Sequence, residues 1–169
     1  PLNISKTFLK KNRVQYINRK NKSGRGSAVI AGFKAASRKN YNLFVEMDAD
    51  FSHNPKELKR NIKYFYKNSL DMLISSRYLK ESKIINWPLS RQIFSKMSNF
   101  LTRLILPVPI SDYTNGYRLY SKRSIKLILN ECGRIGDGFI VLSEILLKIN
   151  SKNYKIDEIK TIFINRKRG

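Results

Sequence analysis

The order of the apolar segments between residues 41 and 78 constrains the fold of this chain more than any other feature. The stretch "YNLFVEMD" is typical of a buried strand, "NPKELKRNIKYFYKN" of a helix and "LDMLISSRY" of a second buried strand. Asn54 and Pro55 suit the N-cap and the first position of that helix. A strand, a helix and a strand in this order indicate a right-handed crossover between two parallel strands. We therefore expect an α/β fold.

The segments around this unit extend the same pattern. Helices are predicted for "GRGSAVIAGFKAASRKN", whose alanines suit close packing on a sheet, and for "LSRQIFSKMSNFLTRLIL", "RSIKLILNE" and "FIVLSEILLKI". "SDYTNGYRLYSK" is typical of a loop that enters a strand, and "IDEIKTIFINR" of a closing strand. No repeat or linker interrupts residues 1–169, so we expect a single domain. Its sheet is expected to be truncated at the front, because no strong apolar strand precedes Tyr41.

The predicted helix over residues 89–106 carries a continuous apolar face. The face consists of Ile93, Phe94, Met97, Phe100, Leu101, Leu104 and Ile105. Packing of this face in the protein core is the favoured interpretation. The alternative is an interfacial helix whose apolar face meets acyl chains while its basic residues meet lipid head groups.

Charge and apolar run length restrict the classes of partner. The 34 Lys and Arg residues outnumber the 12 Asp and Glu residues, and the net charge of +22 indicates phosphates, anionic lipid or nucleic acid. A codon bias toward A and T would also raise the Lys, Asn and Ile content. We do not expect nucleic acid, because Tyr and Phe occupy apolar positions instead of alternating with Lys. Cys132 is the only cysteine, and no apolar run approaches the roughly 20 residues of a transmembrane segment, so we expect a soluble or peripheral chain.

Two carboxylates stand where the first predicted strand ends, in "VEMDADFSHNP". Ligands of open α/β sheets bind at the carboxyl ends of parallel strands, which is the position of Asp48 and Asp50. In an extended backbone these residues lie about 6.6 Å apart on one side, so both can reach one ligand without chelating one ion equally. A hard divalent cation on one carboxylate would clamp a diphosphate and neutralise its charge as it leaves. A solvated acidic turn that caps the next helix is the alternative, and the strand context leaves both open.

Arginine residues are predicted at the same edge of the sheet. Arg77 follows the second strand in "SSRY", and Arg91 and Ser95 lie one helical turn apart on the next helix, where they could hold a phosphate. Arg118 and Arg166 each flank a predicted strand terminus. Each arginine alone is ordinarily a surface or structural residue. A carboxylate pair and several guanidinium groups at one edge favour a binding site for anionic phosphates.

Six motifs then lead to a family: "GRGSAVIAGF", "MDADFSHNP", "SSRY", "RQIFS", "SDYTNGYRLY" and "INRKRG". They occur in the order and approximate spacing of the polyprenol-phosphate (dolichol-phosphate) mannosyltransferases, which the chain resembles over about residues 11–169. "MDADFSHNP" is similar to the "MDADLSHHP" pattern of the dolichol-phosphate mannose synthase branch. The resemblance implies an inverting family 2 glycosyltransferase. It also implies the GT-A fold, a Rossmann-like, mixed and mostly parallel sheet flanked by helices.

The resemblance implies roles for matching residues on the donor side. Asp50 is implied as the direct ligand of Mg²⁺ or Mn²⁺, Asp48 as the bridge to the nucleotide sugar, and Ser52 as a further metal position. The loop of residues 112–118 matches the sugar-side loop of the family, although T-N-G replaces the commoner T-G-S or T-S-G. The other implied donor-binding positions are Gly24, Gly26, Ala49 and Arg118.

On the acceptor side, four residues match positions that hold the lipid phosphate in the family: Arg77, Arg91, Ser95 and Arg166. Asp50 and Arg77 are then the two residues expected to carry the catalysis. Asn165 stands where the family pattern has an acidic residue before the arginine. The implied acceptor is a polyprenyl or dolichyl phosphate at a membrane surface.

The resemblance implies transfer of a hexose to this acceptor, with mannose from GDP-mannose as the favoured donor. A phosphate monoester has a second pKa of about 6, so the acceptor is already a dianion and requires no general base. One phosphate oxygen would attack the anomeric carbon in a single displacement with inversion. His53 is therefore expected to be a turn residue or a donor to Asp50 and not a base. A transferase of glucose or N-acetylhexosamine is the alternative, and a non-catalytic fragment or basic module on anionic membrane is a second.

The two front segments of the family, with P-x-Y-N-E-like and D-D-x-S-x-D-G-T motifs, have no match in this sequence. Those segments hold the nucleotide base and ribose, so the donor site is expected to lack part of its wall. A truncated fragment, a partner that supplies the rest and a chain that is no longer an enzyme remain open. We expect a peripheral location on the cytoplasmic side of a membrane, with a membrane-anchoring partner subunit as one means of attachment.

Overall fold

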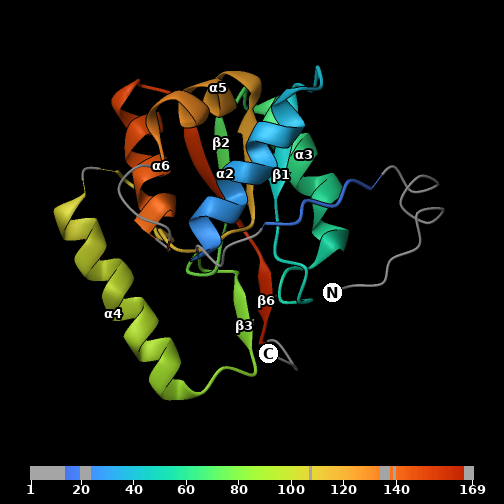
Figure 1. Cartoon of the computed structure of the whole chain (residues 1–169). Coiled ribbons are helices and arrows are strands. Elements are labelled where there is room, and N and C mark those ends of the chain that lie inside the picture. The colour runs from blue at the N-terminus through green and yellow to red at the C-terminus, as the bar shows by residue number, and fades with distance from the viewer. Residues whose placement is uncertain (1–13, 20–23, 107, 134–137, 139, 166–169) are drawn as a thin grey trace.

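A four-stranded mixed sheet forms the centre of the molecule. The computed structural model describes residues 14–19, 24–106, 108–133, 138 and 140–165. The strands lie in the order β1 (Leu43–Glu46), β4 (Arg118–Ser121), β2 (Met72–Ser76) and β5 (Ile156–Lys160) (Figure 1). β4 is antiparallel to β1 and β2, while β2 and β5 pair in parallel. The predicted α/β fold with a mixed sheet is confirmed, and β1, β2 and β5 share one direction.

β4 lies between the two strands that the sequence predicts as a crossover pair. Arg118 at the start of β4 is level with Glu46 on one side and with Ile74 on the other. The preceding loop, residues 112–117, therefore emerges where β1 and β2 end. This placement brings the loop beside the acidic turn that follows β1 and beside the segment that follows β2.

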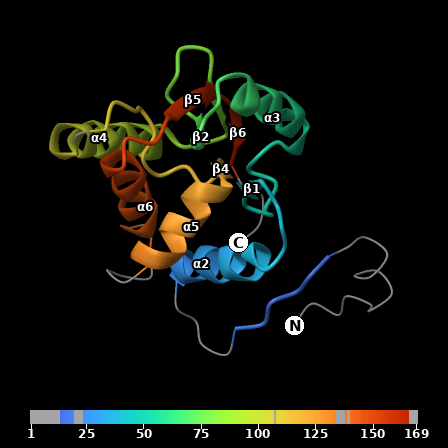
Figure 2. The same cartoon turned by 90° about the horizontal axis from the view of Figure 1, so that it is seen from above.

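Helices cover both faces of this sheet (Figure 2). α2 (Gly24–Ser37), α5 (Lys122–Glu131) and α6 (Ile140–Ser151) lie on one face, and α3 (Leu58–Lys67) lies on the other. Met72 and Ile74 of β2 pack into the core cluster beneath the first three helices, whereas Leu73 packs into the cluster beneath α3. All three side chains are fully buried. Because helices cover both faces of β2, its sequence begins with a continuous apolar run.

The helix predicted after β1 begins as the sequence indicates. The Asn54 side chain accepts a hydrogen bond from the Lys56 backbone N–H at 3.0 Å, and a 3-10 turn, Pro55–Glu57, continues into α3. Glu57 is buried and accepts a hydrogen bond from the Thr161 hydroxyl at 2.5 Å. The start of the helix is thereby tied to the last strands of the chain.

The predicted closing strand is divided in two. β5 ends before Thr161, after which β6 (Ile162–Ile164) pairs in parallel with β3 (Lys83–Ile85) in a separate two-stranded sheet. This small sheet lies below the main sheet in Figure 1. An isolated antiparallel bridge joins Phe163 to His53. β6 therefore lies beside the turn that carries the two carboxylates.

α4 (Leu89–Ile105) lies to one side of the body in both views (Figure 1, Figure 2). Its apolar face points away from the protein, and the exposed fractions of its side chains range from 50% to 78%. This α4 apolar face consists of Ile93, Phe94, Met97, Phe100, Leu101, Leu104 and Ile105. The favoured interpretation of core packing is therefore wrong, because periodicity shows an apolar stripe but not the side on which the body lies. None of the helices that the structure describes is long and apolar enough to cross a membrane.

Candidate functional site

One pocket of about 380 Å³ gathers residues from distant parts of the sequence at the carboxyl ends of β1 and β2. We call it the carboxylate pocket. The predicted site residues in its wall are Asp48, Asp50, Ser52, Arg77 and Arg91. The other described lining residues are Arg25, Trp87, Thr114, Asn115, Gly116, Phe163 and Asn165. The acidic pair and two of the arginines thus converge at one sheet edge.

Asp50 is held by the turn that follows β1. Its Oδ1 accepts hydrogen bonds from the Ser52 hydroxyl at 2.6 Å and from the Ser52 backbone N–H at 3.0 Å. The bond from the hydroxyl is the main cause that lowers the pKa of Asp50, so this carboxylate is ionised at neutral pH. Phe51 between them adopts a positive φ of 64° and exposes 87% of its surface. The turn therefore presents a negatively charged oxygen acceptor to the pocket.

Asp48 is paired with an arginine that the motifs did not single out. Arg25 donates to Asp48 Oδ1 from Nη2 at 2.9 Å and from Nε at 3.3 Å. The same Nη2 lies 3.1 Å from Glu46 Oε1. Gly116 leaves room for this side chain, because a Cβ there would lie 1.7 Å from Arg25 Nη2. Arg25 stands within the motif "GRGSAVIAGF", but only Gly24 and Gly26 of its first three residues were expected to bind the donor.

Glu46 lies at the end of β1, behind the Arg25 guanidinium. It is buried, and burial is the main cause that raises its pKa despite the nearby arginines. Its Oε2 accepts a hydrogen bond from the Tyr120 hydroxyl at 3.0 Å. Glu46 therefore orients Arg25 from inside the protein, while Asp48 does so from the pocket.

His53 is buried beneath the acidic turn. Its Nδ1 accepts a hydrogen bond from the Asp48 backbone N–H at 3.0 Å, so its proton lies on Nε2, which donates to Asn115 Oδ1 at 2.9 Å. Burial lowers the pKa of His53 and favours the neutral ring. The ring links the turn to the loop of residues 112–117. Of the two roles expected for His53, a turn residue or a donor to Asp50, the second is therefore wrong, because both ring nitrogens have other partners.

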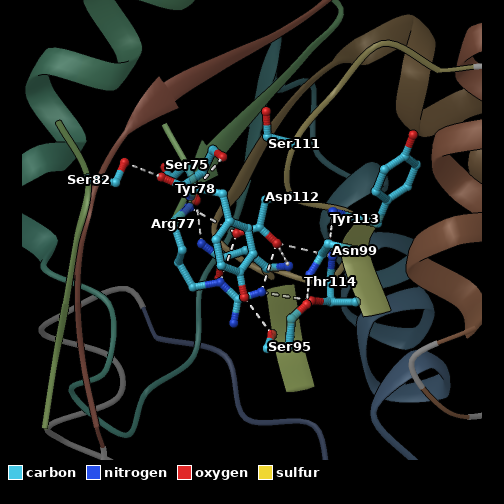
Figure 3. A network of polar contacts seen from close by, with 12 residues as sticks. Ser75, Arg77, Tyr78, Ser82, Ser95, Asn99, Ser111, Asp112, Tyr113 and Thr114 are labelled. Atoms are coloured by element: carbon cyan, nitrogen blue, oxygen red, sulfur yellow. Dashed lines mark hydrogen bonds and ion pairs between the residues drawn. The ribbon is translucent and has the colours of Figure 1, made fainter. Parts of the chain in front are cut away.

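Arg77 forms a two-point ion pair with Asp112 (Figure 3). Its Nε and Nη2 donate to the two carboxylate oxygens at 2.8 and 2.7 Å, and Nη2 also donates to the Thr114 hydroxyl at 2.7 Å. Burial alone would raise the pKa of Asp112, but the bonds and charge of Arg77 lower it overall. The Arg77 guanidinium is therefore a fixed positive charge in the wall of the pocket.

Arg91 reaches the pocket from the first turn of α4. Its guanidinium carbon lies 4.3 Å from the centre of the Trp87 ring, and its Nη1 donates to Asn165 Oδ1 at 3.1 Å. Arg77 approaches the same ring, with its guanidinium carbon 5.4 Å from the ring centre. The Trp87 ring therefore makes cation–π contacts with two arginines at the pocket.

Of the two remaining acceptor-side residues, only Ser95 lies in the described part of the chain. The Ser95 hydroxyl shares a 2.5 Å hydrogen bond with the Tyr78 hydroxyl, and Ser95 is not among the residues that line the pocket. Ser95 lies one helical turn from Arg91 as expected, but its hydroxyl is engaged by Tyr78, and its contact with a phosphate stays a prediction. Arg166 lies outside the described residues.

Arg118 is fully buried and does not line the carboxylate pocket. Its Nε, Nη1 and Nη2 donate to the backbone carbonyls of Asn115 at 2.7 Å, Leu142 at 2.9 Å and Tyr113 at 2.6 Å. The predicted contact of Arg118 with a donor is therefore wrong. The guanidinium instead fixes the loop before β4 from beneath, and no sequence signal distinguishes this role from an exposed one.

The two glycines act through packing and backbone shape. Gly24 begins α2 with a positive φ of 62°, a region that a glycine enters without strain. A Cβ on Gly26 would lie 2.4 Å from Val141 Cγ2, so this glycine allows α2 to approach α6. Neither glycine lines the pocket, and both position the intervening Arg25. Ala49 lines a neighbouring groove of about 540 Å³ between α2 and β1.

The oxygen atoms of the acidic turn suit a hard divalent cation on a single carboxylate. Asp50 and the Ser52 hydroxyl both border the pocket, and hard cations accept carboxylate and hydroxyl oxygens together with water. Asp48 Oδ1 is engaged by Arg25. Among the described residues, no group of three or more His, Cys, Asp and Glu side chains could hold a metal ion. The donor set therefore fits an ion that takes most of its ligands from water or substrate.

The comparisons with known proteins agree on one family. Residues 2–129 match the family described as "Glycosyl transferase family 2". The chain is 33% identical over 157 residues to the polyprenol monophosphomannose synthase of Mycolicibacterium smegmatis, covering 93% of this chain and 58% of that protein. It is also 33% identical over 157 residues to the undecaprenyl-phosphate mannosyltransferase of Micrococcus luteus, covering 92% of this chain and 63% of that protein. The chain thus spans about three fifths of the length of these relatives.

Proposed function

The chain belongs to glycosyltransferase family 2, and on that premise we propose that it transfers a mannosyl group from a nucleotide sugar to a polyprenyl phosphate. The names of the two relatives, a polyprenol monophosphomannose synthase and an undecaprenyl-phosphate mannosyltransferase, support this substrate class. The observation that carries the proposal is the carboxylate pocket. It combines an acidic turn with the guanidinium groups of Arg77 and Arg91.

The two arginines suit an acceptor that is a phosphate monoester. Such a monoester is largely a dianion near neutral pH, because its second pKa is about 6. Arg77 is fixed by Asp112, whereas Arg91 is exposed and can turn from Asn165 toward an anion. Together they would hold the acceptor phosphate and compensate its charge as it meets a second anionic reactant.

The acidic turn suits the diphosphate of the donor, with GDP-mannose as the favoured nucleotide sugar. A Mg²⁺ or Mn²⁺ ion held by Asp50 and the Ser52 hydroxyl would supply positive charge to the departing diphosphate. Asp48 and Arg25 would contact the donor beside it. The presence of these residues in one pocket supports their assignment to the donor.

The reaction that follows is a single displacement. One oxygen of the acceptor phosphate forms a bond to the anomeric carbon, while the bond from that carbon to the diphosphate breaks on the opposite face. No proton moves, because the attacking oxygen is already ionised. The neutral, buried His53 is consistent with this, since its ring nitrogens are committed to Asp48 and Asn115. Alignment and charge compensation are then the contributions of the protein.

We infer a peripheral location on the cytoplasmic side of a membrane, and the exposed apolar face of α4 supports the contact with the membrane surface. The helix carries Arg91 in the pocket at its N-terminal end and an exposed apolar face along the rest of its length. A helix of this kind lies in the interface, with its apolar residues among the acyl chains. The carboxylate pocket would then open where the phosphate of a polyprenyl lipid lies. A membrane-anchoring partner subunit would add to this contact.

Calorimetric titration of Mn²⁺ and GDP-mannose into the chain tests the donor half of this proposal. Donor binding should require the metal and should be lost in Asp50→Asn. Asp157→Asn removes an equal charge on β5, outside the pocket, and should bind as the wild type does. If Asp50→Asn bound the metal and the donor as tightly as the folded wild type, the assignment of this pocket to the donor would be refuted.

Transfer to the lipid is then measured with labelled donor and undecaprenyl phosphate in detergent. Labelled mannosyl lipid should form with the wild-type chain and fall to background in Asp50→Asn and Arg91→Gln. UDP-glucose and UDP-N-acetylglucosamine serve as competing donors. Preferential transfer from either donor would show that its sugar, and not mannose, is transferred. The polyprenyl phosphate would remain the proposed acceptor.

A further inference from the structure

α4 contacts the body through polar side chains, which is the reverse of an ordinary surface helix. Asn99 is buried, and its Oδ1 accepts a hydrogen bond from the Tyr113 backbone N–H at 2.8 Å. Ser95 one turn earlier is bonded to the Tyr78 hydroxyl. The apolar face lies on the opposite side of the helix and is exposed. The polar side of α4 therefore contacts the body of the protein, while its apolar face has no protein contact that would bury it among the described residues.

A second pocket, of about 480 Å³, lies between α4, β3 and the segment after β2. We call it the lysine pocket. Three exposed cations line it, namely Lys80, Lys96 and Arg103, and its other lining residues include Ser82, Gln92 and Phe100. Its described lining contains no Asp or Glu. Within the described part of the chain, no carboxylate forms an ion pair with any of the three cations.

The cations of the lysine pocket adjoin the apolar face of the same helix. Lys96 and Arg103 are seven residues apart, so they lie on one side of α4, about two turns from each other. Phe100 lies between them, lines the pocket and is 60% exposed as part of the α4 apolar face. A group held by Lys96 and Arg103 would therefore be in direct continuity with the surface on which acyl chains would lie.

We propose that the lysine pocket binds the phosphate of an anionic phospholipid head group. This inference rests on the proposed contact between α4 and a membrane, and it adds a lipid class to that contact. Three cations without a carboxylate attract a phosphate, and the Gln92 amide, which donates one hydrogen to the Trp87 carbonyl, has a second hydrogen to donate. The acyl chains of the bound lipid extend past Phe100 along the apolar face. Clusters of basic residues beside an interfacial helix recognise anionic lipid in this way.

The head-group site is separate from the carboxylate pocket. Arg77 borders both pockets, but its guanidinium is engaged by Asp112 and Thr114. Lys80, Lys96 and Arg103 line only the lysine pocket among the pockets described here. A phospholipid can therefore occupy this site without contacting Asp48 or Asp50. Its function is to seat α4 in an anionic bilayer at a fixed depth and orientation.

Co-sedimentation with vesicles tests the site with two matched variants. Lys96→Gln/Arg103→Gln removes two charges from the lysine pocket, and Lys63→Gln/Lys67→Gln removes two exposed charges from α3, across the molecule from α4 (Figure 1). Each protein is mixed with phosphatidylcholine vesicles, with or without phosphatidylglycerol. The wild type should bind more tightly when phosphatidylglycerol is present. The α4 variant should lose roughly tenfold or more of this gain, and the α3 variant should lose much less.

Three results would overturn the inference, and they differ in whether the membrane contact of α4 is also refuted. Equal losses in the two variants would mean that net charge attracts the protein without a site. Equal wild-type binding to both kinds of vesicle would remove the head-group site and leave the membrane contact of α4 intact. Absence of binding to any vesicle would remove both.

Inorganic phosphate distinguishes a free anion from a lipid. It should release the wild type from phosphatidylglycerol vesicles only at concentrations that also act by ionic strength, as matched chloride shows. Release by phosphate at low concentration, absent in the α4 variant and not reproduced by chloride, would assign the pocket to a soluble phosphate ligand and overturn the lipid assignment.

Discussion

Arg77 donates hydrogen bonds to both carboxylate oxygens of Asp112, from Nε at 2.8 Å and from Nη2 at 2.7 Å, and both side chains are buried. Asp112 also accepts hydrogen bonds from the backbone N–H groups of Arg77 at 2.9 Å and Asn115 at 3.0 Å. One carboxylate therefore fixes the segment after β2, the loop before β4 and the guanidinium at the pocket. The position of Arg77 is thus a property of the fold and requires no ligand.

Asp112→Ala should lower the free energy of unfolding by about 3–5 kcal/mol, because it leaves a buried guanidinium and several backbone N–H groups without their acceptor. Asp157→Ala is the control. Asp157 is half-buried and accepts hydrogen bonds from the Tyr64 hydroxyl and the Glu158 N–H, so its loss should cost about 1 kcal/mol. Urea unfolding measures both. Similar losses of unfolding free energy in the two variants would show that the buried Arg77–Asp112 pair contributes no more to stability than the half-buried Asp157 does.

Arg25→Leu should strengthen Mn²⁺ binding to the chain by roughly three- to tenfold, because it frees Asp48 Oδ1 and removes a positive charge beside the metal position. Gly116→Ala should act in the same direction, since its Cβ would displace the end of the Arg25 side chain. Arg38→Leu, which removes an equal charge just after α2, should leave the affinity unchanged. Calorimetry without nucleotide measures all three. Weaker binding in Arg25→Leu would instead make Arg25 a support of the metal position.

His53 should make stability depend on pH in a predictable direction. Burial holds its folded-state pKa below the ordinary 6.5, so the folded state resists protonation more than the unfolded state does. The free energy of unfolding should therefore fall as the pH drops below about 6.5, until it levels off below the folded-state pKa. His53 is the only histidine, so the difference between wild type and His53→Gln isolates its effect. Urea unfolding between pH 7.5 and pH 5, at about half-unit steps, measures that difference. A difference that stays constant with pH would contradict a depressed pKa.

The α4 apolar face should contribute to membrane binding but little to stability. Leu101→Ser/Leu104→Ser should reduce binding to phosphatidylcholine vesicles and change the free energy of unfolding by about 0.5 kcal/mol or less per site, because both side chains are exposed. Leu73→Ala in the core should cost about 2–5 kcal/mol and serves as the comparison. Co-sedimentation and urea unfolding give the two readings. If the α4 variant were as unstable as Leu73→Ala, its apolar face would be a core face after all.

Local patterns were sufficient to predict most of the elements, but not β3 or the division of the closing strand into β5 and β6. Apolar runs and periodicity gave β1, α3, β2 and the later helices, and Asn54 marked the start of the turn into α3. The convergence of Asp48, Asp50 and Arg77 followed from the rule that parallel strands end at one edge. These features depend on neighbours in sequence or on strand direction alone.

Features that depend on distant partners could not be predicted in this way. The insertion of β4 between β1 and β2 is set by pairing across some 75 residues, as between Phe44 and Tyr120. The burial of Arg118 depends on three carbonyl groups that the fold brings to it. Arg25 was missed because its partner Asp48 lies on another element. The outward turn of the α4 apolar face depends on the polar contacts of Asn99, which periodicity does not reveal.

Among the residues that the structure describes, β1 forms one end of the sheet and has a strand neighbour, β4, on one side only. Sheet edges of this kind invite two molecules to pair and aggregate, and short strands and charges oppose this. β1 is four residues long and leads directly to Asp48 and Asp50. The carboxylates proposed to serve the donor therefore also place charge where this edge strand ends. A variant that neutralises both should be checked for self-association by sedimentation before any loss of activity is attributed to chemistry.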